Sequence, residues 1–365
     1  MRDWLVAKGS FISPKVEVDI NDELGYGLKA IEVIQKGEEI CQIPQDLYLM
    51  SQGEHALHDL AVKLCLETLK GQDSPFISFM NTLPSDLSYL PTYWHANHIH
   101  SIEGTALSRD IQRMKSEWKQ SFVSMTASHP GISQDLYLWA RATIQGRAWC
   151  LTSASSFSDG CDKTTALIPF VSLCNHSDRK FSSISLGNGI TCPATSVSIR
   201  AESKYYPSEA IDLNYGELSF QQRILCFGWV DRTIHTNSFA ITPITFEHFG
   251  QRLSYEVKSM MHQHTAVPCE FDLKTERREL KLFLGEISEL CNSTTQDSAK
   301  KLVSVLNEEL VALKSNVDVE HCDFEFNGYY YFHNESMLES DSDYVKRVEV
   351  NALLSLIYAM RTLLD

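Results

Sequence analysis

Two stretches of the chain decide its interpretation: Ala166-Leu-Ile-Pro-Phe-Val-Ser-Leu-Cys-Asn-His-Ser177 and Ile211-Asp-Leu-Asn-Tyr-Gly216. The first is an apolar run that stops at Asn175-His176-Ser177, and the second is an apolar, β-branched approach to Tyr215-Gly216. Apolar runs of this length are typical of buried strands. The sequence therefore predicts two buried strands that deliver polar groups to their ends, where functional groups tend to lie.

An Asn-His pair alone is more often a hydrogen-bonded structural histidine than part of a site. The order of several motifs along the chain is more informative: Leu24-Gly-Tyr-Gly-Leu-Lys-Ala30, Gly37-Glu-Glu-Ile-Cys-Gln-Ile-Pro44, Gly146-Arg-Ala-Trp149, Asn175-His176, Tyr215-Gly216 and Phe227-Gly-Trp229. This order resembles the SET-domain protein methyltransferases, in the branch typified by the Rubisco large-subunit lysine methyltransferase and the actin histidine methyltransferase. The resemblance covers nearly the whole chain.

Composition sets limits on the protein class. A chain of 365 residues with 43% hydrophobic and 10% aromatic residues predicts folded cores and more than one domain. The net charge of −15 excludes a typical nucleic-acid binder, because neutralising phosphates needs a basic surface. An acidic surface instead favours a basic protein partner, such as a lysine-containing segment.

The sequence also predicts a place in the cell. The first residues contain no apolar core of signal-peptide length, and no run approaches the roughly 18 apolar residues of a membrane span. The ten cysteines contain no Cys-x-x-Cys and are expected to be reduced thiols. We expect a monomer in the cytoplasm, and also the nucleus, that does not bind membranes.

Hydrophobic periodicity predicts an α+β fold. Alternating patterns at Val16–Ile20, Leu24–Leu28 and Glu39–Ile43 predict small antiparallel sheets. Helical spacing then dominates from 55 to 145, including a helix that ends at Gly71, one over Leu107–Met125 and one over Leu136–Trp149. Further helices are expected at Ser254–Met261, Lys274–Cys291, Ala299–Lys314 and Ser342–Leu364.

Together with the resemblance, these patterns imply a SET domain over residues 1–235, built from small twisted β-sheets with a pseudoknot and interrupted by a helical insert at about 51–145. An all-helical substrate-binding domain is expected over 240–365. The resemblance implies S-adenosyl-L-methionine as cofactor and a protein lysine side chain as substrate. It assigns Tyr215 as the catalytic residue, and Arg147, Trp149 and Tyr215 as substrate contacts.

The resemblance implies a longer set of cofactor contacts: Leu24, Gly25, Tyr26, Arg147, Ser172, Leu173, Cys174, Asn175, His176, Phe227, Gly228 and Trp229. Leu24 and Ser172 stand where the family commonly has acidic residues, and Phe220 stands where it has asparagine. These three departures favour an alternative, a catalytically silent module that keeps the fold to hold a partner.

A second alternative is histidine methylation. Two positions after the key arginine, the histidine-modifying member of the branch has asparagine, whereas lysine-modifying relatives have an aromatic residue. Trp149 therefore favours lysine, through cation–π contact with an alkylammonium. No metal is expected, because the histidine clusters at 95–100 and 262–264 lack the carboxylate or cysteine spacing of a zinc site.

Overall fold

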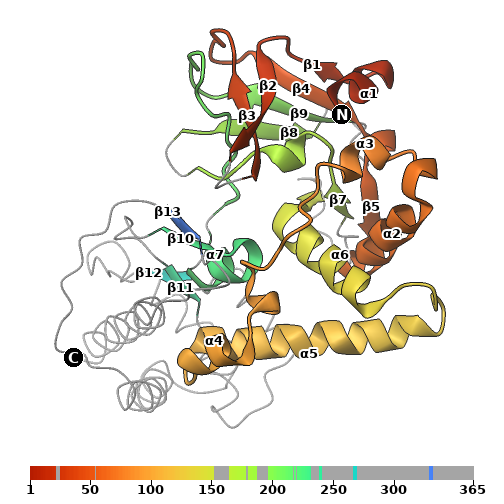
Figure 1. The fold of residues 1–365 in the computed structure, drawn as a ribbon. Helices are drawn as coiled ribbons and strands as arrows, with labels where there is room; N and C mark the ends of the chain where they lie inside the picture. Colours follow the sequence, from red (N-terminus) through yellow and green to blue (C-terminus); the bar gives the residue numbers. More distant parts are fainter. Residues whose placement is uncertain are drawn as a thin grey trace, which may run out of the picture. The chain divides into compact units, whose positions relative to one another are not determined.

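A computed structural model describes residues 1–21, 25–53, 55–151, 164–177, 180–186, 196–216, 218, 220–231, 238–240, 266–268 and 329–331 (Figure 1). The chain divides into two compact units. The first comprises Met1–Leu87 and Trp118–Gly216, and the second comprises Ser88–Glu117 and Glu217–Asp365.

Three small antiparallel sheets form the first unit. The strands, in chain order, are β1 (Phe11–Ile12), β2 (Val16–Asn21), β3 (Gly25–Ala30), β4 (Glu39–Pro44), β5 (Leu49–Gln52), β6 (Trp149–Leu151), β7 (Thr164–Leu167), β8 (Ser182–Leu186) and β9 (Ser196–Ala201). They are ordered β1-β4-β9-β8, β2-β3 and β5-β7-β6. Strands far apart in the sequence therefore pair, such as β4 with β9, and several small sheets take the place of one large sheet (Figure 1).

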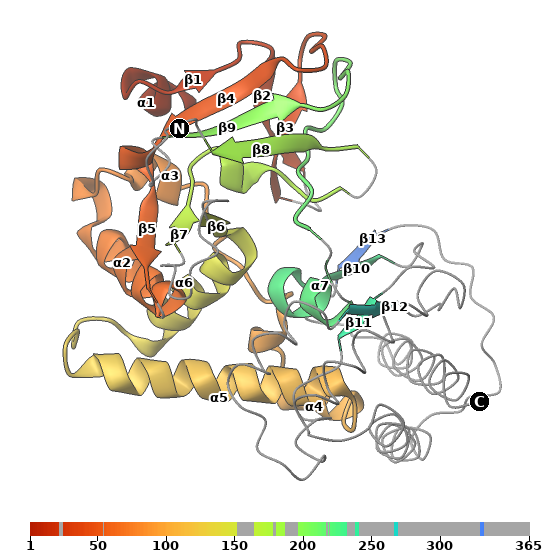
Figure 2. The ribbon, with the colours of Figure 1, turned by 180° about the vertical axis from the view of Figure 1, so that it is seen from behind.

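The helices of the first unit do not all pack on one sheet: two of them cover the β5-β7-β6 sheet, and the first lies beside β1 (Figure 2). They are α1 (Arg2–Ala7), α2 (Ala56–Lys70), α3 (Ile77–Met80) and α6 (Gln134–Arg147), with short 3-10 turns at η1 (Gln45–Leu47), η2 (Gly71–Asp73) and η4 (Val171–Leu173). Leu60 and Leu64 of α2 pack with Ala140 and Ile144 of α6 and are fully or almost fully buried. Burial of this apolar face is what holds α2 and α6 together.

The segment 211–213 holds the first unit together through backbone hydrogen bonds. The Ile211 amide donates to the Leu28 carbonyl, and the Leu213 amide donates to the Asn175 carbonyl, each at 2.8 Å. In return, the Leu213 carbonyl accepts from the Ser177 amide at 3.0 Å. We call this the crossing segment. It lies against residues 175–177 and Ser182, where the resemblance implies a pseudoknot.

The second unit carries two two-stranded sheets. Its elements are η3 (Pro91–Tyr93), α4 (Ala96–Ser101), α7 (Phe220–Phe227), β10 (Trp229–Asp231), β11 (Ser238–Ala240), β12 (Ala266–Pro268) and β13 (Tyr329–Tyr331), and the long α5 (Ala106–Thr126) begins in it. Antiparallel pairing joins β10 to β13 and β11 to β12. None of the helices that the structure describes is long and apolar enough to span a membrane.

Several sequence predictions are corrected by these elements. The chain beyond residue 240 is not all-helical, because β12 and β13 find strand partners about 30 and 100 residues earlier. The helices expected at 254–261, 274–291, 299–314 and 342–364 lie outside the described residues. The predicted domain borders stay a prediction. The two compact units divide the chain after Leu87, Glu117 and Gly216.

The two buried strands predicted around the polar ends are also shorter than expected. β7 stops at Leu167, because Pro169 has no N–H and Phe170 then adopts φ 69° in a γ-turn closed from the Val171 amide to the Pro169 carbonyl. The 211–215 stretch makes isolated bridges only. The helix expected at 136–149 ends at Arg147, and Trp149 begins β6.

Candidate active site

Tyr215 lies just after the crossing segment, and its position is fixed by hydrogen bonds at both ends. Its hydroxyl donates to the Cys174 carbonyl at 2.5 Å, and its amide donates to Nδ1 of His176 at 3.2 Å. The second bond makes Nδ1 the acceptor nitrogen of the imidazole. The two rings lie with their centroids 5.1 Å apart. Tyr215 therefore has one defined orientation, set by residues 41 and 39 positions earlier.

Trp149 forms a second wall beside Tyr215. The ring centroids are 5.7 Å apart and the ring planes are nearly perpendicular, at 87°. Such edge-to-face pairs contribute about 0.5–1.5 kcal/mol beyond the burial of area. β6 supplies Trp149 by pairing it with Ala166 of β7, so the sheet places the indole next to the phenol.

Arg147 is the last residue of α6, and its side chain reaches the turn after β7. Nη1 donates to the Ser172 carbonyl at 2.9 Å, and Ser172 Oγ in turn donates to the Ile168 carbonyl at 2.6 Å. A guanidinium carries five N–H donors, so this bond orients the group and leaves donors for a ligand. Ser172, Leu173 and Cys174 have buried side chains, so their predicted contact with a ligand would come from backbone atoms.

Asn175 lies directly over Gly27 of β3. A Cβ added to Gly27 would come within 3.1 Å of Nδ2 of Asn175. Any larger residue at 27 would push this amide away, because few real Cβ contacts are so short. The Gly-Tyr-Gly motif and the Asn-His motif, about 150 residues apart, therefore meet side by side.

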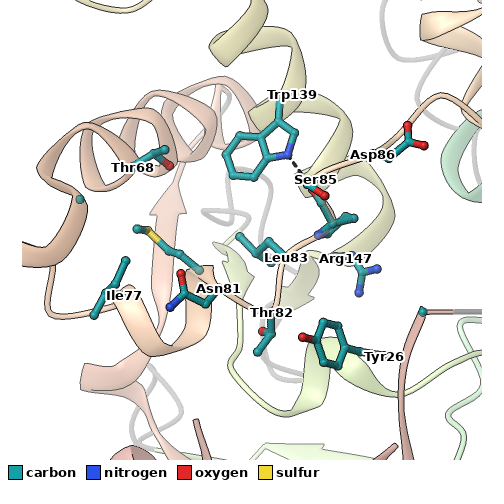
Figure 3. A pocket seen from close by; sticks show the side chains of 14 residues that line it. Tyr26, Thr68, Ile77, Asn81, Thr82, Leu83, Ser85, Asp86, Trp139 and Arg147 are labelled. Atoms are coloured by element: carbon teal, nitrogen blue, oxygen red, sulfur yellow. Dashed lines mark hydrogen bonds between the residues drawn. The ribbon is translucent and has the colours of Figure 1, made fainter. Parts of the chain in front are cut away.

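A cavity of about 850 Å³ opens beside Arg147 (Figure 3). This volume is in the range of small-molecule sites. Its lining includes residues from β3, α2, α3, α6 and the segment 81–86: Gly25, Tyr26, Thr68, Gly71, Ile77, Met80, Asn81, Thr82, Leu83, Pro84, Ser85, Asp86, Trp139 and Arg147. The sequence predicted three of these as ligand contacts, namely Gly25, Tyr26 and Arg147.

The other lining residues were missed by the sequence analysis. Nothing in the sequence marks the Leu83-Pro84 dipeptide as part of a site or brings it to α6. The structure does so through Trp139, whose Nε1 donates to the Pro84 carbonyl at 2.8 Å. The indole N–H of Trp139 indicates that a hydrogen-bond acceptor is needed nearby, but the sequence does not show which residue provides it.

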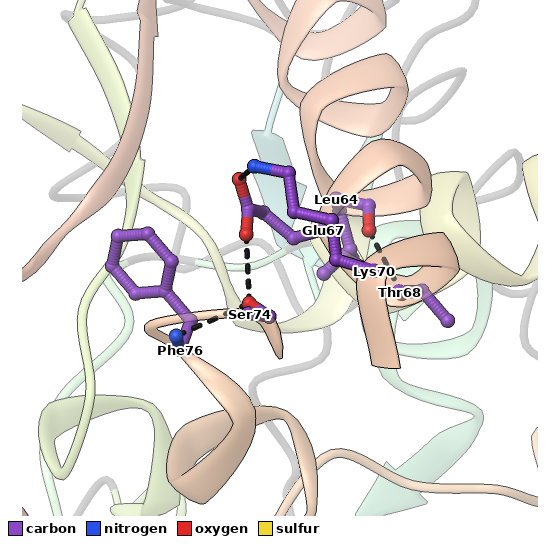
Figure 4. A network of polar contacts seen from close by, with 6 residues as sticks. All are labelled: Leu64, Glu67, Thr68, Lys70, Ser74 and Phe76. Carbon is purple, nitrogen blue, oxygen red and sulfur yellow. Dashed lines mark hydrogen bonds and ion pairs between the residues drawn. The ribbon is translucent and has the colours of Figure 1, made fainter. Parts of the chain in front are cut away.

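One wall of the cavity depends on the turn between α2 and α3, which we call the α2–α3 turn (Figure 4). Glu67 accepts from Lys70 Nζ at 2.6 Å and from Ser74 Oγ at 2.7 Å, and Ser74 Oγ accepts from the Phe76 amide at 3.1 Å. Gly71 ends α2 with φ 55°. Burial raises the pKa of Glu67, but the hydrogen bonds from Lys70 and Ser74 outweigh it and lower this pKa below the usual value.

At Asp212 of the crossing segment and at Cys174 nearby, burial is the largest cause of the pKa shift. Burial raises the pKa of Asp212 to about 6. Burial also raises the pKa of the Cys174 thiol well above its usual value, and the charge of Asp212 adds to this shift. Cys174 is therefore a neutral thiol that packs in the core, and its backbone carbonyl serves Tyr215.

Four of the predicted cofactor contacts are not among the described residues of the first unit. Leu24 falls outside the described residues. Phe227, Gly228 and Trp229 belong to the second unit, where the Arg223 guanidinium lies 5.0 Å from the Trp229 ring centroid. Gly228 has φ 69°, and a Cβ there would come within 2.9 Å of the Tyr89 carbonyl oxygen.

The metal prediction concerns histidines of the second unit as well. His95 and His98 stack edge to face at 6.2 Å, and His100 pairs with Glu103. Over the ranges that the structure describes, no three His, Cys, Asp or Glu side chains are grouped as metal ligands would be. His262 and His264 fall outside those ranges.

Comparison with known proteins gives a partial match in sequence. No protein-family model matches the chain. A stretch of 182 residues is 26% identical to actin-histidine N-methyltransferase of Danio rerio, and the match covers 42% of this chain and 30% of that protein. The chain thus spans less than a third of this curated relative.

Similarity in structure extends over the whole chain. The SET domain of LSMT bound to methyllysine and AdoHcy superposes with a TM-score of 0.64, at 14% identity, over 100% of this chain and 91% of that one. Rubisco LSMT bound to AdoMet gives a TM-score of 0.62, also at 14% identity and with the same coverage. Rubisco LSMT bound to sinefungin and monomethyllysine gives 0.61 at 14% identity, over 99% and 90% of the two chains. The expected α+β fold is thereby confirmed, and the chain has the fold of the SET domain of LSMT.

Proposed function

We propose that this protein transfers a methyl group from S-adenosyl-L-methionine to a lysine side chain of another protein. One observation carries the proposal: Tyr215 lies against Trp149, two residues after Arg147, and Tyr215 and Arg147 both donate hydrogen bonds to backbone carbonyls of the segment 172–174. The cavity beside Arg147 fits an elongated polar cofactor, because it combines a glycine-lined strand with one guanidinium. LSMT, which shares the fold, binds AdoMet, AdoHcy and sinefungin in solved structures.

The residues have separate roles in this proposal. S-adenosyl-L-methionine, when bound, provides a methyl group on a positively charged sulfur. Arg147 would hold the cofactor's carboxylate, and the Gly25–Gly27 strand with Asn175 and His176 would hold the rest of it. The Tyr215 hydroxyl donates a hydrogen bond to the Cys174 carbonyl, so its oxygen is oriented to accept a hydrogen bond from an attacking amine. Positioning of this kind can provide most of the rate acceleration in a displacement reaction.

The aromatic walls favour an alkylamine as the acceptor. A lysine ammonium must lose its proton before it attacks, and a desolvated aromatic channel lowers its pKa in that direction. Trp149 can wall such a channel and attract an alkylammonium through its ring face. Its indole N–H donates but does not accept, so it cannot hold the N–H of a neutral imidazole.

Histidine is the second candidate acceptor, and one observation favours it. The curated relative with detectable sequence similarity is named an actin-histidine N-methyltransferase. In both cases the partner would be a protein with a basic segment, which suits the net charge of −15. We further propose action in the cytoplasm or nucleus on a non-histone protein.

The test begins with cofactor binding and ends with product analysis. Calorimetry should detect S-adenosyl-L-methionine binding to the intact chain, and failure to bind would favour the silent module. Transfer of a labelled methyl group into a cell lysate would then reveal substrates, and amino-acid analysis would identify the modified residue. Methyllysine is expected. Methylhistidine as the main product would overturn the lysine assignment and leave the proposed methyltransferase activity standing.

Trp149→Asn provides a sharper test of the acceptor. Loss of the indole removes the edge-to-face contact with Tyr215 and the cation–π wall, so lysine methylation should fall by roughly tenfold. The asparagine carbonyl could instead accept from an imidazole, so some methylhistidine should form. Trp149→Phe is the matched control, because it keeps an aromatic wall; loss of activity as large as in Trp149→Asn would contradict the cation–π role.

A further inference from the structure

Tyr205 is a buried tyrosine that is anchored outside the crossing segment. Its side chain is fully buried, in the same core cluster as Ile34. The Tyr205 amide donates to the Ile34 carbonyl, and the Ile34 amide donates to the Tyr205 carbonyl, each at 3.0 Å. Lys180 Nζ lies 4.5 Å from the centroid of the phenol ring and also pairs with Glu209. Groups that do not belong to the crossing segment therefore hold both the backbone and one ring face of Tyr205.

The Tyr205 hydroxyl is linked to the crossing segment through Ser182. The two hydroxyl oxygens are 2.9 Å apart and share a hydrogen bond, and Ser182 is 2% exposed. The Ser182 amide donates to the Asp212 carbonyl at 2.8 Å, and Ser182 also forms a bridge with Leu213. Burial raises the pKa of Tyr205, so its hydroxyl stays protonated at neutral pH. Ser182 therefore bonds to Tyr205 with its side chain and to the crossing segment with its backbone.

The crossing segment determines where Tyr215 lies, because it ends two residues earlier in the chain. Leu213 exchanges hydrogen bonds with Asn175 and Ser177, at 2.8 and 3.0 Å. These bonds fix the crossing segment to the stretch 174–177, which also bonds to Tyr215. Ser182 begins β8 of the β1-β4-β9-β8 sheet. Its bond to the Asp212 carbonyl therefore ties this whole arrangement to the four-stranded sheet.

We propose that Tyr205 is a positioning residue for methyl transfer, which acts through its hydrogen bond to Ser182 on the crossing segment and so on Tyr215. This inference rests on the proposed function, in which Tyr215 orients the acceptor nitrogen. Tyr205 is fully buried and does not line the cavity beside Arg147, so its effect on the reaction is indirect. A small displacement of an orienting group slows a reaction strongly, because the reacting atoms must be closely aligned.

The experiment compares Tyr205→Phe with Tyr48→Phe. Tyr48 is a matched control, because it is a buried tyrosine of the same core cluster whose hydroxyl donates to the Ile43 carbonyl at 2.7 Å. Labelled methyl transfer into one fixed cell lysate, titrated with S-adenosyl-L-methionine, gives the rate at saturation and the half-saturating concentration. Tyr205→Phe should lower the rate by roughly five- to tenfold and leave the half-saturating concentration within about twofold.

The control variant separates positioning from general stability. Tyr48→Phe should leave the rate and the half-saturating concentration unchanged, even where it lowers the Tm as much as Tyr205→Phe does. Equal losses of rate in the two variants would overturn the proposal, because the loss of any buried hydroxyl would then be enough. A loss confined to cofactor affinity in Tyr205→Phe would overturn it as well.

Ser182→Ala removes the other end of the same hydrogen bond. It should lower the rate at saturation as much as Tyr205→Phe does, and the double variant should lose no more than either single variant, because one bond is lost only once. Losses that multiply in the double variant would show that the two hydroxyls act separately and would refute the proposal. If Tyr205→Phe does not fold, an unchanged rate in Ser182→Ala would still refute it.

Hydrogen exchange separates this inference from the proposed function. The amides of Ile211 and Leu213 are bonded across the crossing, so their exchange reports on its opening without any methyl transfer. Exchange over 211–215 should be roughly tenfold faster in Tyr205→Phe and Ser182→Ala and unchanged in Tyr48→Phe. Unchanged exchange in all three variants would overturn the inference. If exchange changes as expected but the unaltered protein transfers no methyl group, the proposed function fails, and Tyr205 holds the crossing segment without a role in methyl transfer.

Discussion

The crossing segment and the α2–α3 turn each contain a partly buried carboxylate, and the two carboxylates respond oppositely to their surroundings. The pKa of Asp212 is raised to about 6 by burial. The pKa of Glu67 is lowered by hydrogen bonds from Lys70 and Ser74 that outweigh burial. At the crossing, the hydrogen bonds are made by backbone groups, and the described residues place no donor on the Asp212 side chain. In the α2–α3 turn, the side chains of Lys70 and Ser74 donate hydrogen bonds to the Glu67 carboxylate.

The difference reflects the distance over which each region is assembled. The crossing joins residues 28, 175, 177 and 182 to residues 211–213, so its geometry is set by tertiary structure. The α2–α3 turn is formed within ten residues, and all of its hydrogen-bond partners are present in that short stretch of sequence. Changes at the crossing should therefore affect the proposed site around Tyr215, and changes in the turn should affect only the cavity wall and local stability.

Tyr215→Phe should have the largest effect. Removal of the hydroxyl abolishes the bond to the Cys174 carbonyl and the group that orients the acceptor. Turnover should fall by on the order of a hundredfold or more, with cofactor affinity nearly unchanged, because the hydroxyl acts mainly in the transition state. Steady-state kinetics with calorimetry measures this; lost cofactor binding with normal turnover at saturation would contradict it.

Asp212→Asn should stabilise the protein at neutral pH. The folded-state pKa of about 6 lies above the usual aspartate pKa of 3.8, so the favourable contribution of Asp212 is present below pH 3.8 and lost as pH rises through 6. Above that pH the buried charge costs on the order of 3 kcal/mol, which asparagine removes. Chemical unfolding from pH 5 to 8 should show a gain that grows with pH. A constant gain would contradict the titration.

Gly27→Ala should act on Asn175, whose carbonyl accepts a hydrogen bond from the crossing segment. The added Cβ meets Nδ2 of Asn175 at 3.1 Å, so the amide must shift by a few tenths of an ångström. We expect about 1 kcal/mol of destabilisation and a severalfold loss of cofactor affinity. Gly131→Ala, with open space around its Cβ, is the matched control. Equal effects of the two variants would show that Asn175 tolerates the contact.

Glu67→Gln should have the smallest effect. Because the folded pKa of Glu67 is below its unfolded value, its contribution is present above about pH 4.5 and is lost as pH falls through the folded pKa. The variant should lose less than about 1 kcal/mol at pH 7 and show a weaker acid dependence. Activity should be unchanged at saturating cofactor. A large loss of turnover would mean that the α2–α3 turn also affects the proposed site around Tyr215.

Local patterns predicted most of the first unit's elements. The alternation at Val16–Ile20 became β2, the spacing of Leu60 and Leu64 became α2, and Gly71 ends that helix with positive φ as expected. The predictions failed where a long-range or backbone effect competed with the pattern. Strand β7 ends early, before the γ-turn at Phe170, and β13 pairs across about 100 residues with β10.

The sequence by itself determined the order of the motifs, the resemblance they carry, and the identity of Tyr215, Arg147 and Asn175 as candidates. Only the tertiary structure decided that Tyr215 bonds to Cys174, that Asn175 lies over Gly27, and that Asp86 shares a cavity with Arg147. The physical reason is that a motif records side-chain chemistry and local backbone preference. Contacts between residues 60 or 150 positions apart depend instead on how strands cross and helices pack.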